Sequence, residues 1–303
     1  MLDVLVTCHP HAPEPSFFPQ VRGHYLAKHL ARSGLQAEFR NLPSPGTECT
    51  VLICSEYQCD MAWFDRLLST PLSEIRAERM FCLAEYSLGR RDHSSREYLD
   101  WFAARGGVLC QLLEEPLGPH EHWIGVGADV EAVGHLGPRD SVVFDFSDLN
   151  RNPDAVFDAR LVGEVRRRLP GCRMVGTGPA GSSVAGLFDE WVPYGRPHAD
   201  YIRAVLPRAF GVVVGLPGVG ESMGLFLAEA QCVGAALVFR PDRVKEGMVG
   251  HEAAVPYERD EPGLLGDAVV EARGRDPRRI RSEAAERFGY DAVVRRTRVA
   301  IGL

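Results

Sequence analysis

One segment limits the fold of this chain more than any other, the stretch GLPGVGESMGLFLAEAQCVGAALVFR at residues 215–240. A β-branched run ends just before it at Val214, and a glycine-rich loop follows. Apolar residues then recur at helical spacing, which predicts a helix with one buried face. Gly234 ends this helix, and a buried strand extends to Phe239. The order strand, loop, helix, strand predicts a parallel α/β fold.

Two carboxylates lie in this segment, Glu221 in the loop and Glu229 eight residues later in the helix. A glycine-rich loop before a helix presents unpaired backbone N–H groups, which together with the helix dipole favour an anion such as a phosphate. Glu229 lies about two turns further on, beyond reach of the same phosphate. Carboxylates accept hydrogen bonds from paired hydroxyls. A nucleotide sugar has all the matching groups: a diphosphate, a ribose diol and a hexose.

The segment from Glu221 to Ala235 resembles the E-x7-E motif of retaining GT-B glycosyltransferases, in the manner of glycosyltransferase family 4. That group includes sucrose synthases and mannosyltransferases. The chain keeps both glutamates, Gly224, Ala230 and Gly234. The resemblance implies an α/β GT-B architecture, in which two Rossmann-like parallel-sheet domains face each other across a cleft. It also implies retention at the anomeric carbon, no catalytic metal and no cofactor beyond the nucleotide-diphosphate sugar.

The resemblance further implies roles for individual residues. Glu221 would be catalytic and meet a hexose hydroxyl, while Glu229 would hold the ribose diol. Backbone N–H groups at the start of the helix would contact the hexose or the phosphate. The donor-binding residues of this segment are then Ser222, Met223, Gly224, Leu225 and Glu229.

Two partial motifs point elsewhere and are rejected. Residues 215–222 have the outline of a P-loop, but Glu221 replaces the lysine and would repel the terminal phosphates. Residues 176–181 form a G-x-G-x-x-G pattern after a short strand at 172–175, but the acids that follow come too early for a dinucleotide fold. Gly178, in the loop predicted there, is retained as a donor-binding candidate.

The chain departs from the family pattern at the cations that bind the donor phosphates. The family usually places an arginine and a lysine after the first strand of the donor domain, where this chain has Ser147 and no lysine. Arg151 and Arg196 are the candidates to replace them, because a guanidinium binds phosphate oxygens in pairs. A solvated loop position for Arg151 is an equal alternative.

Composition sets the remaining limits. A length of 303 residues suits two domains of about 150 residues. A net charge of −7 and the lack of a basic stripe argue against a nucleic-acid partner. The sequence contains no run of eighteen apolar residues, so we expect no membrane-spanning helix. Eight scattered cysteines without a C-x-x-C pair, and an N-terminus without a basic leader, predict a cytoplasmic protein.

Alternating strands and helices predict an acceptor domain at residues 1–134, a donor domain at 135–283 and a last helix at 284–303 that crosses back to the first domain. In the first domain we expect helices near 23–33, 61–69 and 95–105 between strands. Loops at the carboxyl ends of its strands hold the ligand-facing residues. By its position in the chain, His93 would meet the donor sugar as a catalytic residue. A solvated loop position for His93 is an equal alternative. The acceptor-side candidates are His9, Glu85 and Tyr86.

The expected function is transfer of a sugar from a nucleotide diphosphate to a small-molecule or lipid acceptor with retention, with natural-product biosynthesis as one setting. Two alternatives stay open. One is a GT-B-like sugar-nucleotide epimerase, which needs no separate acceptor. The other is a degenerate, non-catalytic transferase, which binds a nucleotide sugar or only pairs with a partner protein. The sequence does not identify the donor base, the sugar, the acceptor or the oligomeric state.

Overall fold

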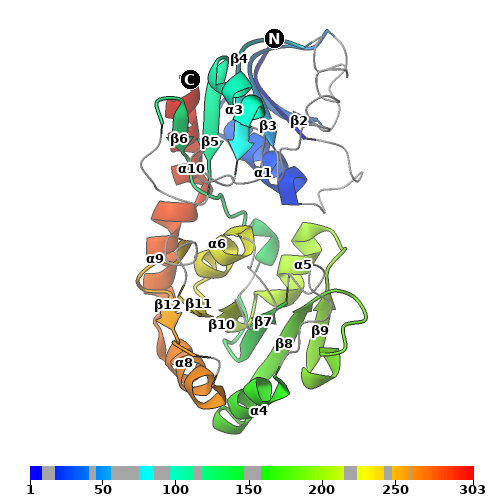
Figure 1. The fold of residues 1–303 in the computed structure, drawn as a ribbon, viewed down its shortest axis with the longest axis vertical. Coiled ribbons are helices and arrows are strands. Elements are labelled where there is room, and N and C mark those ends of the chain that lie inside the picture. Colours follow the sequence, from blue (N-terminus) through cyan, green and yellow to red (C-terminus); the bar gives the residue numbers. More distant parts are fainter. Residues whose placement is uncertain are drawn as a thin grey trace. The chain divides into compact units, whose positions relative to one another are not determined.

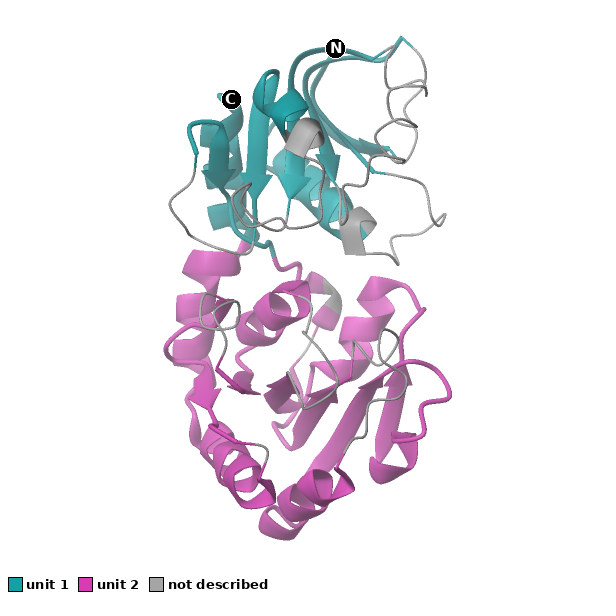
Figure 2. Cartoon of the chain, viewed as in Figure 1, with its two compact units in different colours: residues 1–127, 290–303 teal, residues 128–289 magenta. Residues whose placement is uncertain are grey.

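A computed structural model describes residues 1–8, 18–40, 46–55, 75–84, 96–111, 118–134, 136–146, 158–214, 224–241, 248–259 and 261–303. The chain forms two compact units, which Figure 2 shows in separate colours. Unit 1 consists of Met1–Gly127 and Tyr290–Leu303, and unit 2 is Ala128–Gly289. Each unit contains one parallel sheet of six strands. The predicted α/β class is therefore confirmed.

The sheet of unit 1 has the strand order β2-β1-β3-β4-β5-β6. Its strands are parallel throughout, as expected for strands joined by helical crossovers. Their bounds are β1 Leu2–Thr7, β2 Ala37–Arg40, β3 Glu48–Ser55, β4 Arg76–Ala84, β5 Gly106–Cys110 and β6 Glu121–Trp123. The described helices α1 (Phe18–Arg32) and α3 (Arg96–Ala103) pack on these strands.

Helix α1 begins at Phe18, before the expected start near Gly23. Gly23 lies inside the helix, where an added Cβ would come within 2.9 Å of Phe39 and 3.2 Å of Ser55 and Val6. The absence of a side chain lets α1 approach the sheet closely. Gly23 thus allows α1 to pack against the strands that carry Phe39, Ser55 and Val6.

The last helix, α10 (Tyr290–Ile301), belongs to unit 1 and contacts α1 and β5. The ring of Tyr290 stacks on His29 with 3.9 Å between ring centroids, and a Cβ on Gly127 would lie 2.4 Å from the Tyr290 ring. Arg296 donates a 2.7 Å hydrogen bond to the carbonyl of Ile124 and lies 4.4 Å over the Trp123 ring. These contacts fix the C-terminal helix beside the end of the first chain segment.

Unit 2 has the strand order β12-β11-β10-β7-β8-β9, also parallel throughout. The bounds are β7 Ser141–Asp145, β8 Arg173–Gly178, β9 Glu190–Pro193, β10 Ala209–Val214, β11 Ala236–Phe239 and β12 Ala254–Pro256. The order reverses between β7 and β10, so the crevice at their carboxyl ends is the expected ligand position in an open α/β sheet. All residues of β7, β10 and β11 are buried, which is typical of a sheet covered on both faces.

The described helices of unit 2 are α4 (Ala159–Arg168), α5 (His198–Val205), α6 (Gly224–Cys232), α8 (Pro262–Gly274) and α9 (Pro277–Phe288). In Figure 1, α5 and α6 lie at the upper end of this unit and α4 and α8 at its lower end. None of the helices in the described ranges has the length and apolar character needed to cross a bilayer.

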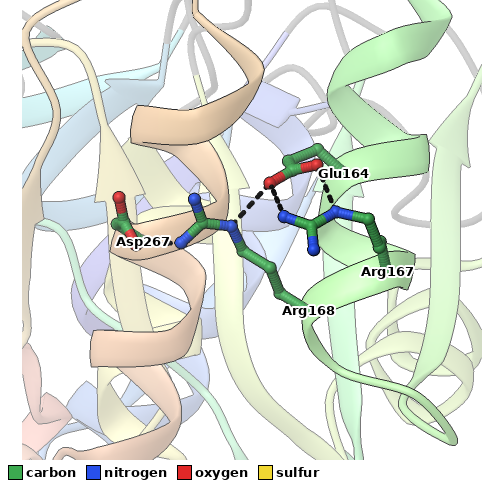
Figure 3. A network of polar contacts seen from close by, with 4 residues as sticks. All are labelled: Glu164, Arg167, Arg168 and Asp267. Carbon is green, nitrogen blue, oxygen red and sulfur yellow. Dashed lines mark hydrogen bonds and ion pairs between the residues drawn. The ribbon is translucent and has the colours of Figure 1, made fainter.

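Charged side chains join α4 to α8 (Figure 3). Glu164 accepts hydrogen bonds from Arg167 and Arg168, and Arg168 also pairs with Asp267 of α8. Gly266 allows the approach, since a Cβ there would lie 2.6 Å from Arg168. Hydrogen bonds from Arg167, then from Arg168, lower the pKa of Glu164 to about 2. This network lies at the C-terminal end of α4, which leads into the amino end of β8, so it is remote from the carboxyl edge of the sheet.

Candidate functional site

Polar side chains gather in unit 2 at the carboxyl ends of the strands beside the switch point. Asp145 is the last residue of β7, Tyr194 follows β9, and His198 is the first residue of α5. Glu229 lies in α6, the helix after β10. Because parallel strands end at one edge, residues far apart in sequence meet here.

Glu229 and His198 form a close pair. The Oε1 atom of Glu229 lies 2.6 Å from Nε2 of His198, and the two side chains are 0% and 13% exposed. The other carboxylate oxygen, Oε2, is buried and has no hydrogen-bond partner among the described residues. Every residue of α6 from Gly224 to Gln231 is buried, so this helix gives the carboxylate no solvated face.

A third buried group, Asp129, adds negative charge to this pair. It precedes the short helix η3 (Glu131–Val133), which contacts α5. Burial alone would lower the pKa of His198, but the charge and hydrogen bond of Glu229, with the charge of Asp129, raise it overall. Burial raises the pKa of Glu229, and His198 opposes that shift. The protonated imidazole is therefore favoured, and it donates a hydrogen bond to the Glu229 carboxylate.

A second polar group lies next to it. The Tyr194 hydroxyl donates a 2.5 Å hydrogen bond to Asp145, which is 2% exposed. The Thr177 hydroxyl lies 3.1 Å from the Tyr201 hydroxyl and 3.0 Å from the carbonyl oxygen of Val192. Burial, followed by the charge of Asp145, raises the pKa of Tyr201 well above its usual value. Tyr201 is thus a neutral hydroxyl inside the site.

The ring of Tyr201 connects the two groups. Its centroid lies 5.5 Å from that of Tyr194, 6.3 Å from that of His198 and 5.7 Å from that of Phe226 in α6. Aromatic packing therefore fixes the spacing between α5, α6 and the end of β9. These ring contacts connect the elements that carry the site within unit 2.

Five predicted donor-binding residues lie in the described part of the chain, and they fall at this edge. Gly224 and Leu225 begin α6 and are buried. Arg196 is exposed in the turn between β9 and α5. Gly178 ends β8, and Glu229 is the centre of the buried pair. The remaining predicted residues lie outside the described ranges: Glu221, His93, Arg151, Ser222, Met223, His9, Glu85 and Tyr86.

The glycine pattern at residues 176–181 differs from the predicted loop. Strand β8 continues through Gly178, where the prediction ended it at Val175. A Cβ on Gly176 would lie 2.5 Å from Trp191 and 2.7 Å from Phe188. A Cβ on Gly178 would lie 3.0 Å from both Phe146 and Trp191. Both glycines make room for aromatic rings, and a donor contact by Gly178 stays a prediction.

Sequence reasoning missed His198, Asp145, Tyr194 and Asp129. The available signal was weak: Asp145 and Tyr194 are polar residues at strand ends, the usual ligand edge. His198 is a lone histidine at the start of α5. Its partner is 31 residues away, a separation that no local pattern reports.

Among the residues that the structure describes, no group of three or more His, Cys, Asp or Glu side chains has the arrangement of a metal site. The three carboxylates near the switch point are paired with His198 and Tyr194 or lie beside them. Their chemistry is suited to accepting hydrogen bonds from ligand hydroxyls.

No protein-family model matches the sequence, and the search of curated proteins finds no match. Solved structures do match over nearly the whole chain. Sucrose-phosphate synthase from Thermosynechococcus elongatus has a TM-score of 0.62 and 12% identity, covering 97% of each chain. HepE from Anabaena in complex with UDP-glucose has a TM-score of 0.61 and 11% identity, covering 100% of each.

The lipopolysaccharide outer core galactosyltransferase WaaB has a TM-score of 0.60 and 9% identity, covering 99% of each chain. At these identities the similarity shows the fold. The strand orders, the two parallel sheets and these three structures together establish that the chain has the GT-B glycosyltransferase fold.

Proposed function

We propose that this protein is a retaining, metal-independent glycosyltransferase that moves a sugar from a nucleotide diphosphate to a small-molecule or lipid acceptor. The observation that carries the proposal is the buried carboxylate of Glu229 at the switch point of unit 2, with one oxygen still lacking a described partner. One structure of the same fold, HepE, is complexed with UDP-glucose. That ligand is a nucleotide sugar of the kind proposed here.

In this proposal, Glu229 accepts a hydrogen bond from the ribose of the donor. The Glu229 side chain is 0% exposed, so this carboxylate lies in an environment that excludes water. In the proposed complex, the ribose hydroxyl donates to Oε2, the oxygen of Glu229 that has no described hydrogen-bond partner. A hydrogen bond to a buried charged acceptor is worth roughly 1.5–3 kcal/mol, which makes the ribose a strong anchor.

The diphosphate would lie at the start of α6. Gly224 and Leu225 begin this helix, whose first N–H groups and dipole attract negative charge. Charge builds up on the leaving diphosphate as the glycosidic bond breaks, and oriented backbone donors stabilise it without reorganising. Arg196, exposed after β9, and Arg151 would supply positive charge, while Glu221 would meet the hexose. Acceptor recognition would use His9, Glu85 and Tyr86, with His93 near the donor sugar.

A thermal-shift panel tests the proposal. The ligands are the uridine, guanosine, adenosine and thymidine diphosphates and their sugar conjugates. A ligand at 100 times its dissociation constant stabilises a protein by about 2.7 kcal/mol, which is a readable shift. We expect one base to stabilise the wild type and not Glu229→Ala. The matched control is Glu258→Ala, which removes an exposed glutamate of the same unit and retains the shift.

If no nucleotide stabilises the folded wild type, the transferase proposal fails and a non-catalytic role takes its place. If a nucleotide sugar binds, incubation with and without candidate acceptors, followed by NMR of the anomeric proton, tests the reaction. Transfer with an unchanged anomeric configuration supports retention, and an inverted product refutes it. Donor isomerisation without any acceptor identifies an epimerase.

A further inference from the structure

We infer that His198 is a positioning residue for ribose recognition: its imidazole holds one oxygen of Glu229 and thereby directs the other oxygen at a ribose hydroxyl. This inference rests on the proposed function and adds a residue to it. Its motivation is the geometry of the pair, with Oε1 2.6 Å from the imidazole and Oε2 buried without a described partner.

A purely structural role does not account for the pair. Helix α6 is otherwise apolar or neutral along its buried residues, and its position in the core would suit an apolar side chain. Replacing a buried ion pair by apolar residues is often neutral or stabilising, so folding alone gives little reason to keep this pair. A buried oxygen that lacks a partner carries a further energetic cost and requires an explanation. A ligand hydroxyl that completes the carboxylate supplies one.

The start of α5 fixes the imidazole. Pro197 precedes the helix with φ −49° and ψ 137°, and the proline ring restricts φ. The His198 ring also packs near Tyr201, whose centroid is 6.3 Å away. The imidazole thus follows a restricted backbone position and packs near one ring, and its hydrogen bond orients Glu229 before the donor binds. Such preorganisation reduces the ordering cost of binding.

The groups around His198 give the inference a pH dependence. The imidazole faces the carboxylates of Glu229 from α6 and Asp129 from the segment before η3, and Tyr201 of its own helix remains neutral. Both carboxylates favour the imidazolium. Once the pH rises above the raised pKa of His198, the positive charge is lost, and the neutral imidazole donates to Glu229 only in the tautomer that carries its proton on Nε2. We therefore expect nucleotide affinity to fall at high pH.

Calorimetric titration of the full-length protein provides the test. The probes are UDP, GDP and ADP, each compared with its 2′-deoxy and 3′-deoxy forms. We expect the wild type to bind one ribonucleotide at least about tenfold more tightly than the form lacking the hydroxyl that faces Oε2. In His198→Phe, which has no donor, this ratio falls towards one.

His198→Gln supplies the conservative comparison, because its amide nitrogen reaches the position of Nε2 without titrating. It retains the preference for the ribose hydroxyl, and its affinity no longer changes with pH. His251→Gln, an exposed histidine of the same unit, is the matched control and behaves as the wild type does in both respects.

The outcomes separate the two proposals. If a nucleotide binds and His198→Phe keeps the full hydroxyl preference, the positioning role is refuted and the proposed function stands. If none of these nucleotides, and none of the thermal-shift panel, binds to the wild type, both are refuted. Should His198→Phe fail to fold, the pH profile of His198→Gln decides: a flat profile supports the role, and a profile identical to that of the wild type overturns it.

Discussion

Replacing His198 by phenylalanine leaves the carboxylate of Glu229 in a helix whose neighbouring residues are all buried. Glu229 is 0% exposed, its described hydrogen-bond partner is lost, and the nearby Asp129 has the same charge. Removing one member of a buried ion pair costs about 3–5 kcal/mol, since the other charge remains without compensation. We expect His198→Phe to destabilise unit 2 by this amount at neutral pH.

The sign of the pH dependence follows from both groups. The pKa of His198 is raised by folding, so its contribution to stability is complete below its unfolded pKa of about 6.5 and is lost as pH rises through the folded value. The pKa of Glu229 is also raised, so the folded state binds its proton more tightly and stability again falls with rising pH. In His198→Phe, the penalty is therefore smaller at acidic pH, where the raised pKa lets Glu229 bind a proton more readily, than at pH 8.

Unit 2 has a convenient reporter in Trp191, the tryptophan of residues 128–289. Urea unfolding of fluorotryptophan-labelled protein, followed by fluorine NMR, resolves this residue from those of unit 1. The double variant His198→Phe/Glu229→Gln is the control, since removing the charge recovers most of the loss. The reasoning is refuted if His198→Phe unfolds at the wild-type urea concentration at pH 8, or if the double variant is no more stable than the single one.

Three further predictions address the frame of the site and the core. Gly176→Ala places a methyl group against Trp191 and Phe188 and should lower the free energy of unfolding by about 1–3 kcal/mol in the same urea assay. The control Gly163→Ala lies in an open position of α4 and should raise the free energy of unfolding by about 0.5–1 kcal/mol. Equal effects of the two variants would refute the packing role. Tyr194→Phe removes the hydrogen bond to buried Asp145 and should lower the free energy of unfolding by about 1.5–3 kcal/mol. An unchanged free energy of unfolding would contradict a hydrogen bond to a charged carboxylate. Burial raises the pKa of Cys49 to about 11 and that of the partly exposed Cys232 to about 12, so mass spectrometry should find both thiols unlabelled by a disulfide reagent at pH 8 until urea is added. Rapid labelling of either thiol in the native state would contradict its raised pKa.

Much of the fold was predictable because buried parallel strands are continuous apolar runs. Strand β10 and strand β11 are wholly buried and were predicted from their β-branched and apolar residues. The two strands that were missed, β6 and β12, have three residues each and lie at the edges of their sheets. Strands that short carry no periodicity, and their pairing depends on the neighbour that the fold provides.

The glycines show a second limit. The run at residues 176–181 suggests a loop, because glycine weakens a strand. The structure continues β8 to Gly178, since Trp191 and Phe188 fill the space that side chains would take. This compensation comes from aromatic residues 12 to 15 positions later, which local propensity cannot include.

The candidate site was predictable only where a motif carried it. Glu229 was identified from its spacing to Glu221 and the surrounding helix. Its pairing with His198, and the hydrogen bond between Tyr194 and Asp145, arise from strand order, which brings the ends of β7, β9 and β10 to one edge. Such constellations depend on topology, so the residues alone do not reveal them.

The central claim is that unit 2 binds a nucleotide sugar at the carboxyl edge of its sheet through Glu229. A crystal structure of the protein with the nucleoside diphosphate that gives the largest thermal shift tests it most directly. The account predicts a ribose hydroxyl within hydrogen-bond distance of Glu229 Oε2, with Oε1 still on His198 and the diphosphate at the start of α6. A nucleotide bound elsewhere, with Glu229 still closed off, would contradict it.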